Sequence, residues 1–255
     1  MTTEDLASKE KPDLSIVIPT WNGLELLRRN LPSVLEAQLR FLVDCRLSSE
    51  LIIVDDASSD ETVDRVPLEF PSARLVCRAK NGGFSKACNS GLGICRAPVI
   101  ALLNNDVQVD PGYFLYQYPH FRDPHIFAVT TKVFEGEPPV FSAGGRFSSF
   151  RRGFWSVYSN YDIRGAESDE WTSQHDFLSL YAISGFAKYD RQKLGKLGGF
   201  TEVRLRAREK RLCRRTDVQV HDLLQAFYNT DPIQVFRSGQ EIVQFHNKNG
   251  ESDTQ

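Results

Sequence analysis

The sequence predicts an α/β domain in which a mostly parallel sheet lies between two layers of helices. Short apolar runs of strand length alternate with segments whose leucines recur at helical spacing, which is the pattern of parallel-sheet proteins. The runs are nearly continuous rather than alternating, as in strands that helices cover on both faces. Clusters of polar residues end the runs, and ligands bind beyond the carboxyl ends of strands in such sheets.

The first strand is expected at Leu14–Ile18, a β-branched run that Pro19 ends. Pro32 lies within the helix that should follow and predicts a kink or a restart there. That helix is expected because four leucines recur at helical spacing, namely Leu24, Leu27, Leu31 and Leu35.

The next two helices are expected at Glu61–Val66, which Ser59, Asp60 and Glu61 can cap, and at Phe84–Cys95. Three further buried strands are expected between and after them, at Leu51–Val54, Arg74–Cys77 and Val99–Leu103.

The second half of the sequence is less regular. Residues 107–175 mix aromatic residues with Gly and Pro and predict an irregular stretch with short strands. A strand is expected at Leu178–Tyr189, with Ser184 and Gly185 inside it, and a short helical turn at Lys193–Phe200 that ends at its Gly-Gly pair.

Size and composition suit one soluble globular domain. The 255 residues are placed in a single domain at residues 13–248, with polar and disordered tails expected at residues 1–12 and 249–255. The net charge of -2 gives no overall attraction to nucleic acid. The five cysteines have no metal-binding spacing, and no apolar run approaches the roughly 20 residues of a membrane helix, so the sequence predicts a cytoplasmic protein.

The polar clusters suggest chemistry, although each also has an ordinary structural explanation. A carboxylate such as Asp106 directly after a buried strand suits Mg²⁺ or Mn²⁺ beside phosphates, but Asn and Asp also favour turns. Asp55 and Asp56 suit hydrogen bonds to a base or a ribose, and equally a turn or a helix cap. Gly82 and Gly83 open a helix whose N-terminus favours anions, yet such pairs are mostly structural.

Six segments stand in a characteristic order and spacing, namely Leu14–Asn22, Ile52–Asp60, Asn81–Gly91, Leu102–Asp106, Ile183–Ala187 and Leu197–Glu202. Taken together, they resemble glycosyltransferase family 2, whose members invert the sugar and have the GT-A fold. The resemblance spans about residues 13–202 and is most similar to the rhamnosyltransferase-like branch of polysaccharide-building enzymes.

The resemblance implies a Rossmann-like, three-layer α/β/α GT-A domain with a nucleotide-sugar-binding half at residues 13–106 and an acceptor-binding half at residues 107–248. It implies a hexosyltransferase that moves a sugar, with inversion and with Mg²⁺ or Mn²⁺, from a UDP- or dTDP-sugar to a hydroxyl of a glycan or lipid-linked glycan.

The resemblance also implies roles for individual residues. Asp106 would bind the metal, with His246 as a second ligand, although a lone histidine near a chain end is more often an ordinary surface residue. Ser184 and Gly185 would border the acceptor. The residues expected to line the nucleotide sugar are Pro19, Thr20, Asn22, Asp55, Asp56, Asn81, Gly82, Gly83, Phe84, Lys86 and Asn105.

The acidic motif that supplies the general base in the family, Glu-Asp-x-Asp-Leu, has no clean copy in this chain. Two candidates remain, Glu209 and Asp217. Aligning Asp217 with the acidic motif of the family requires a small insertion before it, but gives a better sequence separation to His246. It is preferred, because the arginines around Glu209 would lower the pKa of that carboxyl and make it a weaker base.

The segment Arg204–Arg215 holds seven basic residues and one acid. Three explanations fit this segment. It can be a solvated helical face, or it can bind a phosphate-bearing acceptor or the anionic inner face of a membrane. It can also be a degenerate catalytic segment. The last reading gives the alternative function, a nucleotide-sugar-binding protein with weak or no activity. A sugar-nucleotide pyrophosphorylase is disfavoured, because Pro19–Asn22 stands where those enzymes have a Gly-rich basic loop.

Overall fold

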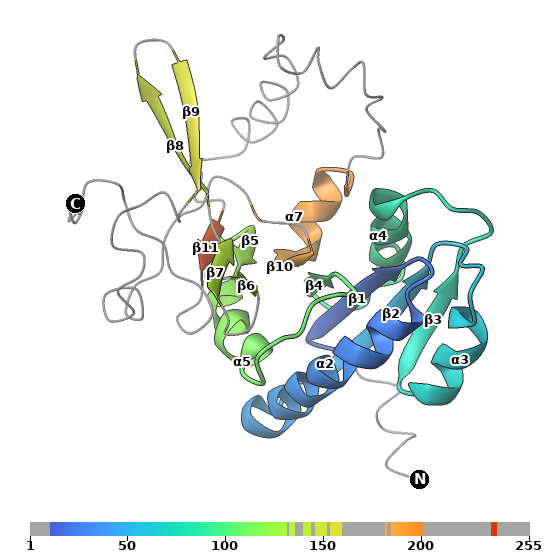
Figure 1. The fold of residues 1–255 in the computed structure, drawn as a ribbon. Coiled ribbons are helices and arrows are strands. Elements are labelled where there is room, and N and C mark those ends of the chain that lie inside the picture. Colours follow the sequence, from blue (N-terminus) through green and yellow to red (C-terminus); the bar gives the residue numbers. More distant parts are fainter. Residues whose placement is uncertain are drawn as a thin grey trace.

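The computed structural model describes residues 11–131, 133–135, 140–143, 146–151, 154–159, 182, 185–200 and 236–238. Strands and helices alternate through its first half, as Figure 1 shows. The strands there are β1 (Leu14–Thr20), β2 (Ser49–Asp55), β3 (Ala73–Cys77) and β4 (Val99–Leu103). The helices between them are α2 (Leu24–Cys45), α3 (Thr62–Glu69) and α4 (Phe84–Leu92).

The second half adds shorter elements. Its helical segments are α5 (Tyr113–Gln117), the 3₁₀ helix η1 (Tyr118–Arg122) and α7 (Arg191–Lys196). Its strands are β5 (Ala128–Thr130), β6 (Val133–Glu135), β7 (Val140–Ala143), β8 (Arg146–Arg151), β9 (Phe154–Ser159), β10 (Phe186–Asp190) and β11 (Phe236–Ser238). Strands β6 and β7 form one antiparallel pair, and β8 and β9 form another.

The main sheet has the strand order β11-β5-β10-β4-β1-β2-β3. Strands β1, β2, β3 and β4 run parallel, whereas β10 is antiparallel to both β4 and β5. In the register of the sheet Thr20 lies opposite Asp55, and Asp55 lies opposite Cys77. The carboxyl ends of β1, β2 and β3 are therefore level with one another at one edge of the sheet.

Helices cover both faces of this sheet, which makes three layers (Figure 1). On one face, Ile16 and Ile53 pack in a buried cluster with Leu27 and Phe41 of α2 and Phe114 of α5. On the other face, a second cluster is formed by Val17, Ile52, Val54, Cys88 of α4 and Leu194 of α7. Successive residues of one strand point to opposite faces, so an almost continuous apolar run fills both clusters.

The predicted order of strands and helices in the first half is confirmed, with different helix ends. Pro32 does not end or restart helix α2, which continues to Cys45. A proline within a helix removes only one backbone hydrogen bond, and the packing of the rest of the helix on the core outweighs that loss. Helix α3 runs on to Glu69. Helix α4 ends at Leu92 rather than at Cys95, because the amides of Gly93 and Ile94 turn back to the carbonyls of Asn89 and Gly91.

The second half differs more from the prediction. Gly185 does not lie within a strand; it forms a turn with φ +100° immediately before β10, a conformation that suits glycine. Helix α7 begins earlier than predicted, at Arg191, because the Asp190 side chain accepts a hydrogen bond from the Lys193 amide at 2.9 Å. The helical turn α5 was not predicted. Of the predicted tails, only residues 11 and 12 are described.

Candidate functional site

Polar residues from three strand ends meet at the carboxyl edge of the sheet. The Asp56 amide, just after β2, donates to the Thr20 carbonyl at the end of β1, at 2.9 Å. The Asn105 side chain, just after β4, donates through Nδ2 to Thr20 Oγ1 at 2.9 Å. Asn30 of α2 donates to the Asn105 carbonyl at 3.0 Å and so fixes this loop from below. Polar clusters that follow three different strands are therefore in contact through Thr20, Asp56 and Asn105.

The buried Asp56 carboxylate holds the loop that enters α4. It accepts hydrogen bonds from the amide of Gly83 at 2.7 Å, from the amide of Gly82 at 3.0 and 3.1 Å, and from the Arg78 guanidinium at 2.6 Å. Sequence reasoning missed Arg78. Asp55 and Cys77 pair at the ends of β2 and β3. The residues that follow them, Asp56 and Arg78, are therefore brought together, and strand register is what identifies Arg78.

The neighbouring Asp55 side chain is also buried but has far fewer partners. Its Oδ2 accepts a hydrogen bond from the Ser58 amide at 3.0 Å. Its Oδ1 has no hydrogen-bond partner among the described residues. The two carboxylates predicted to contact the base or the ribose therefore differ: the chain itself occupies Asp56, and it leaves one oxygen of Asp55 unpaired.

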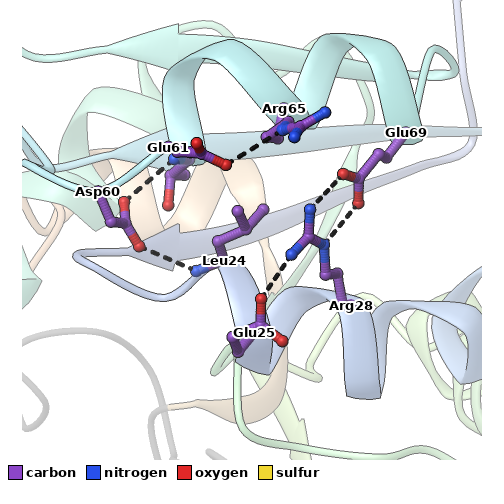
Figure 2. A network of polar contacts seen from close by, with 8 residues as sticks. Leu24, Glu25, Arg28, Asp60, Glu61, Arg65 and Glu69 are labelled. Atoms are coloured by element: carbon purple, nitrogen blue, oxygen red, sulfur yellow. Dashed lines mark hydrogen bonds and ion pairs between the residues drawn. The ribbon is translucent and has the colours of Figure 1, made fainter.

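The loops after β1 and β2 are tied to each other. Asn22, with φ 49°, accepts a hydrogen bond from the Ser59 amide at 2.7 Å and donates its own amide to Ser58 Oγ at 2.8 Å. Asp60 joins the beginnings of two helices, since it accepts from the amides of Leu24 at 3.3 Å and Thr62 at 3.1 Å (Figure 2). The N-cap residue of α3 is Glu61, whose side chain makes no capping hydrogen bond, and Asp60 one residue earlier accepts the Thr62 amide instead.

The same face of α2 and α3 carries exposed ion pairs. Arg28 contacts Glu69 through two hydrogen bonds of 2.5 and 2.8 Å and Glu25 through one of 2.5 Å (Figure 2). Burial opposes ionisation of Asp60, but the hydrogen bonds from Thr62 and Leu24 outweigh it and hold the pKa of Asp60 below its usual value. These contacts join the start of α2 to Asp60 and to α3.

The loop after β4 brings the metal candidate next to the acceptor candidate. Asp106 is exposed at the tip of this loop. The Asn104 amide donates to the Gly185 carbonyl at 2.8 Å, and a Cβ at Gly185 would collide with the Asn104 side chain. Asn104 Oδ1 is buried and has no hydrogen-bond partner among the described residues. Gly185 therefore lies against the loop that carries Asp106.

The donor set at this edge fits a metal that is bound mainly by substrate. In the described part of the chain, no three His, Cys, Asp or Glu side chains gather into a metal-binding cluster. Asp106 offers a single exposed carboxylate, and Mg²⁺ commonly takes one or two protein carboxylates and completes its shell with phosphate oxygens and water.

The other predicted site residues divide into two groups. Pro19 is buried in β1 opposite Val54, Asn81 and Phe84 are exposed at the start of α4, and Lys86 is half-buried on that helix. The remaining candidates lie outside the described residues, and their roles stay predictions: Ser184, Glu209, Asp217, His246 and the basic segment Arg204–Arg215.

Comparison with known proteins identifies the family. The family model for glycosyl transferase family 2 matches residues 15–197. The chain belongs to glycosyltransferase family 2. This confirms the resemblance of its motifs to the family. The rhamnosyltransferase-like branch is a narrower assignment that the family model does not address.

Two relatives of the chain are named for the synthesis of succinoglycan and of chondroitin. It is 31% identical over 101 residues to the succinoglycan biosynthesis protein ExoO of Rhizobium meliloti (strain 1021), an alignment covering 39% of this chain and 27% of ExoO. It is 25% identical over 208 residues to a chondroitin synthase of Escherichia coli, covering 78% of this chain and 29% of the synthase. The chain thus spans less than a third of the length of either relative.

A solved structure shares the fold. The mannosyltransferase PcManGT of Pyrobaculum calidifontis, solved with GDP-Man and Mn²⁺, superposes with a TM-score of 0.53 at 19% identity, over 91% of this chain and 58% of that one. The predicted fold class is confirmed: the chain is a GT-A-like, three-layer α/β protein with a mostly parallel sheet. Among the helices that the structure describes, none is both long and apolar enough to cross a bilayer.

Proposed function

We propose that this family 2 transferase moves a sugar from a nucleoside-diphosphate sugar to a hydroxyl group of an acceptor, with inversion and with Mg²⁺ or Mn²⁺. One observation carries the proposal: Thr20, Asp56 and Asn105 converge at the carboxyl edge, where the exposed Asp106 carboxylate follows Asn105 in a single loop. Ligands of open α/β sheets bind at such an edge.

The donor would lie across the loops that follow β1, β2 and β4. Because the amides of Gly82 and Gly83 already donate to Asp56, contact with the donor at the start of α4 falls to the side chains of Asn81, Phe84 and Lys86. Lys86 adds positive charge near the N-terminal end of α4, which favours a diphosphate. Asp55 is the candidate for a base N–H or a ribose hydroxyl; its buried Oδ1 has no partner among the described residues and would have to become accessible for that contact.

The transfer would be a direct displacement. Asp217, or Glu209 as the alternative, takes the proton of the acceptor hydroxyl, whose oxygen bonds to the anomeric carbon as the bond to the diphosphate breaks. Asp106, with His246 as a further candidate, would hold a divalent ion that neutralises negative charge on the departing diphosphate. Gly185 and Ser184 would border the acceptor.

The narrower parts of the proposal have different support. The motifs favour the rhamnosyltransferase-like branch, a hexosyl donor carried on UDP or dTDP, and polysaccharide synthesis on a glycan or lipid-linked glycan. PcManGT, with its GDP-Man and Mn²⁺, supports a nucleotide sugar and a metal. Residues 13–106 would form the donor half and residues 107–248 the acceptor half. Contact of Arg204–Arg215 with the inner face of a membrane, and cytoplasmic residence, rest on the sequence alone.

The proposal is tested at Asp106. Stabilisation of the chain by UDP, dTDP or GDP should require Mn²⁺, and Asp106→Asn should abolish the Mn²⁺-dependent part of the thermal shift. Nucleotide release from the matching sugar should fall about 100-fold, since a metal contributes several kcal/mol of charge stabilisation. Asp44→Asn is the matched control, because Asp44 is an exposed carboxylate on the last turn of α2 that pairs only with Arg40 among the contacts described. Equal binding and release by both variants would refute the assignment of Asp106.

A second function is favoured by the missing acidic motif. A nucleotide-sugar-binding protein without transfer would show the same Mn²⁺-dependent binding in calorimetry, with no nucleotide released from any donor in the panel. Release above the uncatalysed rate, lost in Asp217→Asn or Glu209→Gln, would decide for the enzyme and identify its base.

A further inference from the structure

Helix α2 carries a buried asparagine on the face that packs against the sheet. Asn30 is 5% exposed and lies at helical spacing from two buried apolar residues, Leu27 and Val34. Burial of an amide costs free energy unless the amide is hydrogen-bonded. An apolar side chain at this position would avoid that cost, so the asparagine indicates a contact that requires a polar group.

That contact is with the loop that carries Asp106. Asn30 Nδ2 donates at 3.0 Å to the carbonyl of Asn105, the residue directly before Asp106. The Asn105 side chain is held as well, because its Nδ2 donates to Thr20 Oγ1 at 2.9 Å. Position 105 is therefore fixed both through its carbonyl and through its side chain.

A second residue of α2 holds the same loop on the other side of Asp106. The Val109 amide donates to Ser33 Oγ at 3.1 Å, and the Ser33 hydroxyl donates in turn to the Asn30 carbonyl at 2.7 Å. The Val109 side chain is buried in the core on this face of the sheet. The exposed Asp106 thus lies between two fixed positions, one residue after Asn105 and three residues before Val109.

The close approach of α2 to this loop depends on Gly23, the N-cap residue of the helix. A Cβ at Gly23 would lie 2.3 Å from Asn105 Nδ2 and 2.4 Å from Thr20 Oγ1. Non-bonded heavy atoms do not approach so closely, so a side chain at position 23 would displace the loop. The φ of Gly23 is -122°, which other residues adopt readily, so this position requires space rather than the conformational freedom of glycine.

We propose that Asn30 is a positioning residue for the divalent ion: together with Ser33, it holds the loop so that the Asp106 carboxylate meets an ion on the diphosphate. The inference rests on the proposed function, in which Asp106 binds Mg²⁺ or Mn²⁺. Groups that orient a metal ligand without touching the metal commonly contribute about 10- to 100-fold to metal affinity. A carboxylate on an unrestrained loop would lose conformational freedom on binding the ion, and the two contacts of α2 remove that cost beforehand.

The test compares Asn30→Leu and Ser33→Ala with Gln38→Ala. Asn30→Leu keeps the size of the side chain and removes the donor to the Asn105 carbonyl. Ser33→Ala removes the second contact with the loop and leaves Asn30 in place, so it tests the inference even if Asn30→Leu does not fold. Gln38 is the matched control, because it donates from the same helix to Ser49 Oγ at the start of β2, at 3.0 Å, at the opposite edge of the sheet.

The main measurement is the affinity for Mn²⁺ rather than turnover. Mn²⁺ is titrated by thermal shift into each variant in the presence of whichever of UDP, dTDP and GDP stabilises wild type most. Asn30→Leu and Ser33→Ala should each require about 10-fold more Mn²⁺ than wild type for half-maximal stabilisation, and Gln38→Ala should require the wild-type concentration. Without metal or nucleotide, the Val109 amide should exchange with deuterium faster in Ser33→Ala than in wild type.

A double variant tests whether Asn30 acts through Asp106. Nucleotide release from the donor that wild type uses best should fall about 10-fold in Asn30→Leu. Adding Asn30→Leu to Asp106→Asn should cause no further fall, because the contact has no carboxylate left to position. An equal fall in both backgrounds would give Asn30 a general structural role and overturn the inference.

The outcomes separate the two proposals. If Asp106→Asn abolishes the Mn²⁺-dependent stabilisation while Asn30→Leu and Ser33→Ala keep the wild-type affinity for Mn²⁺, the positioning role is overturned and the proposed function stands. If Asp106→Asn binds Mn²⁺ and nucleotide as wild type does, the assignment of Asp106 is refuted and the inference fails with it. If wild type binds no nucleotide with Mn²⁺, the proposed function itself fails.

Discussion

Two regions of the molecule bury charged side chains and satisfy them in opposite ways. At the carboxyl edge, the Asp56 carboxylate accepts hydrogen bonds from two backbone amides and from Arg78. Where β10 packs against α5, the fully buried Lys188 amine donates to Gln117 Oε1 and faces the rings of Tyr113, at 3.3 Å, and Phe114, at 5.2 Å.

The pKa of Lys188 shows how incomplete its surroundings are. Aromatic faces attract a cation, but two rings and one amide oxygen do not replace its water, so burial lowers the pKa of Lys188 well below its usual value. Gln117 Nε2 has no hydrogen-bond partner among the described residues, and burial also raises the pKa of the Tyr113 hydroxyl above its usual value. The comparison teaches that backbone amides can stabilise a buried ion at an edge, whereas a core with few polar partners lowers the pKa of a buried amine and so disfavours its charged form.

The largest expected effect is at Asp56. Asp56→Asn places an NH₂ group against three donors and leaves the Arg78 guanidinium without its anion, so the free energy of unfolding should fall by about 3 kcal/mol in urea denaturation. Asp55→Asn is the matched control on the neighbouring residue, and it should change the free energy by less than about 1 kcal/mol, since among the described residues Asp55 accepts one hydrogen bond. Equal losses at the two positions would break the contrast between them.

The next effect is of opposite sign and lies at Lys188. The double variant Lys188→Met/Gln117→Leu should raise the free energy of unfolding by about 1–3 kcal/mol at pH 7, because both polar partners become apolar together. Gln117→Leu alone should destabilise, because it leaves the amine without an acceptor.

The pH dependence sharpens this prediction. Because the folded state of the wild type lowers the pKa of Lys188, the unfolded state binds the extra proton, and wild-type stability recovers as pH rises toward about 10. The advantage of the double variant should therefore shrink between pH 7 and pH 9.5 in urea titrations. A constant difference over that range would show that Lys188 keeps its charge in the folded protein.

The smallest effect on the free energy of unfolding is expected at Asp60, which joins the first turns of α2 and α3. Asp60→Ala removes the acceptor for the amides of Leu24 and Thr62 and should lower the free energy of unfolding by about 1 kcal/mol above pH 5. Because the pKa of Asp60 is lowered in the folded state, this contribution should disappear as pH falls through that pKa. Arg28→Ala on the same face (Figure 2) is the control and should leave the melting temperature unchanged at 150 mM salt.

Local pattern was enough to predict the strands and the convergence at the edge. Leu14–Ile18 and Leu51–Val54 are apolar, β-branched and closed by polar residues, so the alternation with helices requires them to be parallel and their tips to meet. The pattern failed at Gly185, which lies in a turn before β10 rather than within the predicted strand, because an apolar run does not reveal the positive φ of one glycine.

The partners of buried polar groups were not predictable in this way. Arg78 reaches Asp56 across 22 residues, and Asn89 reaches Phe200 across 111. Neither contact leaves a periodic signal in its own segment. Each depends on strand register and on how closely two distant backbones approach, and Gly199 alone permits the second.

By itself, the sequence determined that this chain forms a parallel sheet covered by helices on both faces, with polar residues at the strand ends. The reason is that buried apolar residues recur with the period of the strand or helix that contains them. Only the tertiary structure decided that Asp56 binds the chain's own loop, that Lys188 is buried in the core with a lowered pKa and that Asn89 holds Phe200. A hydrogen bond requires two particular atoms within about 3 Å, and folding alone brings such atoms together when they are far apart in the chain.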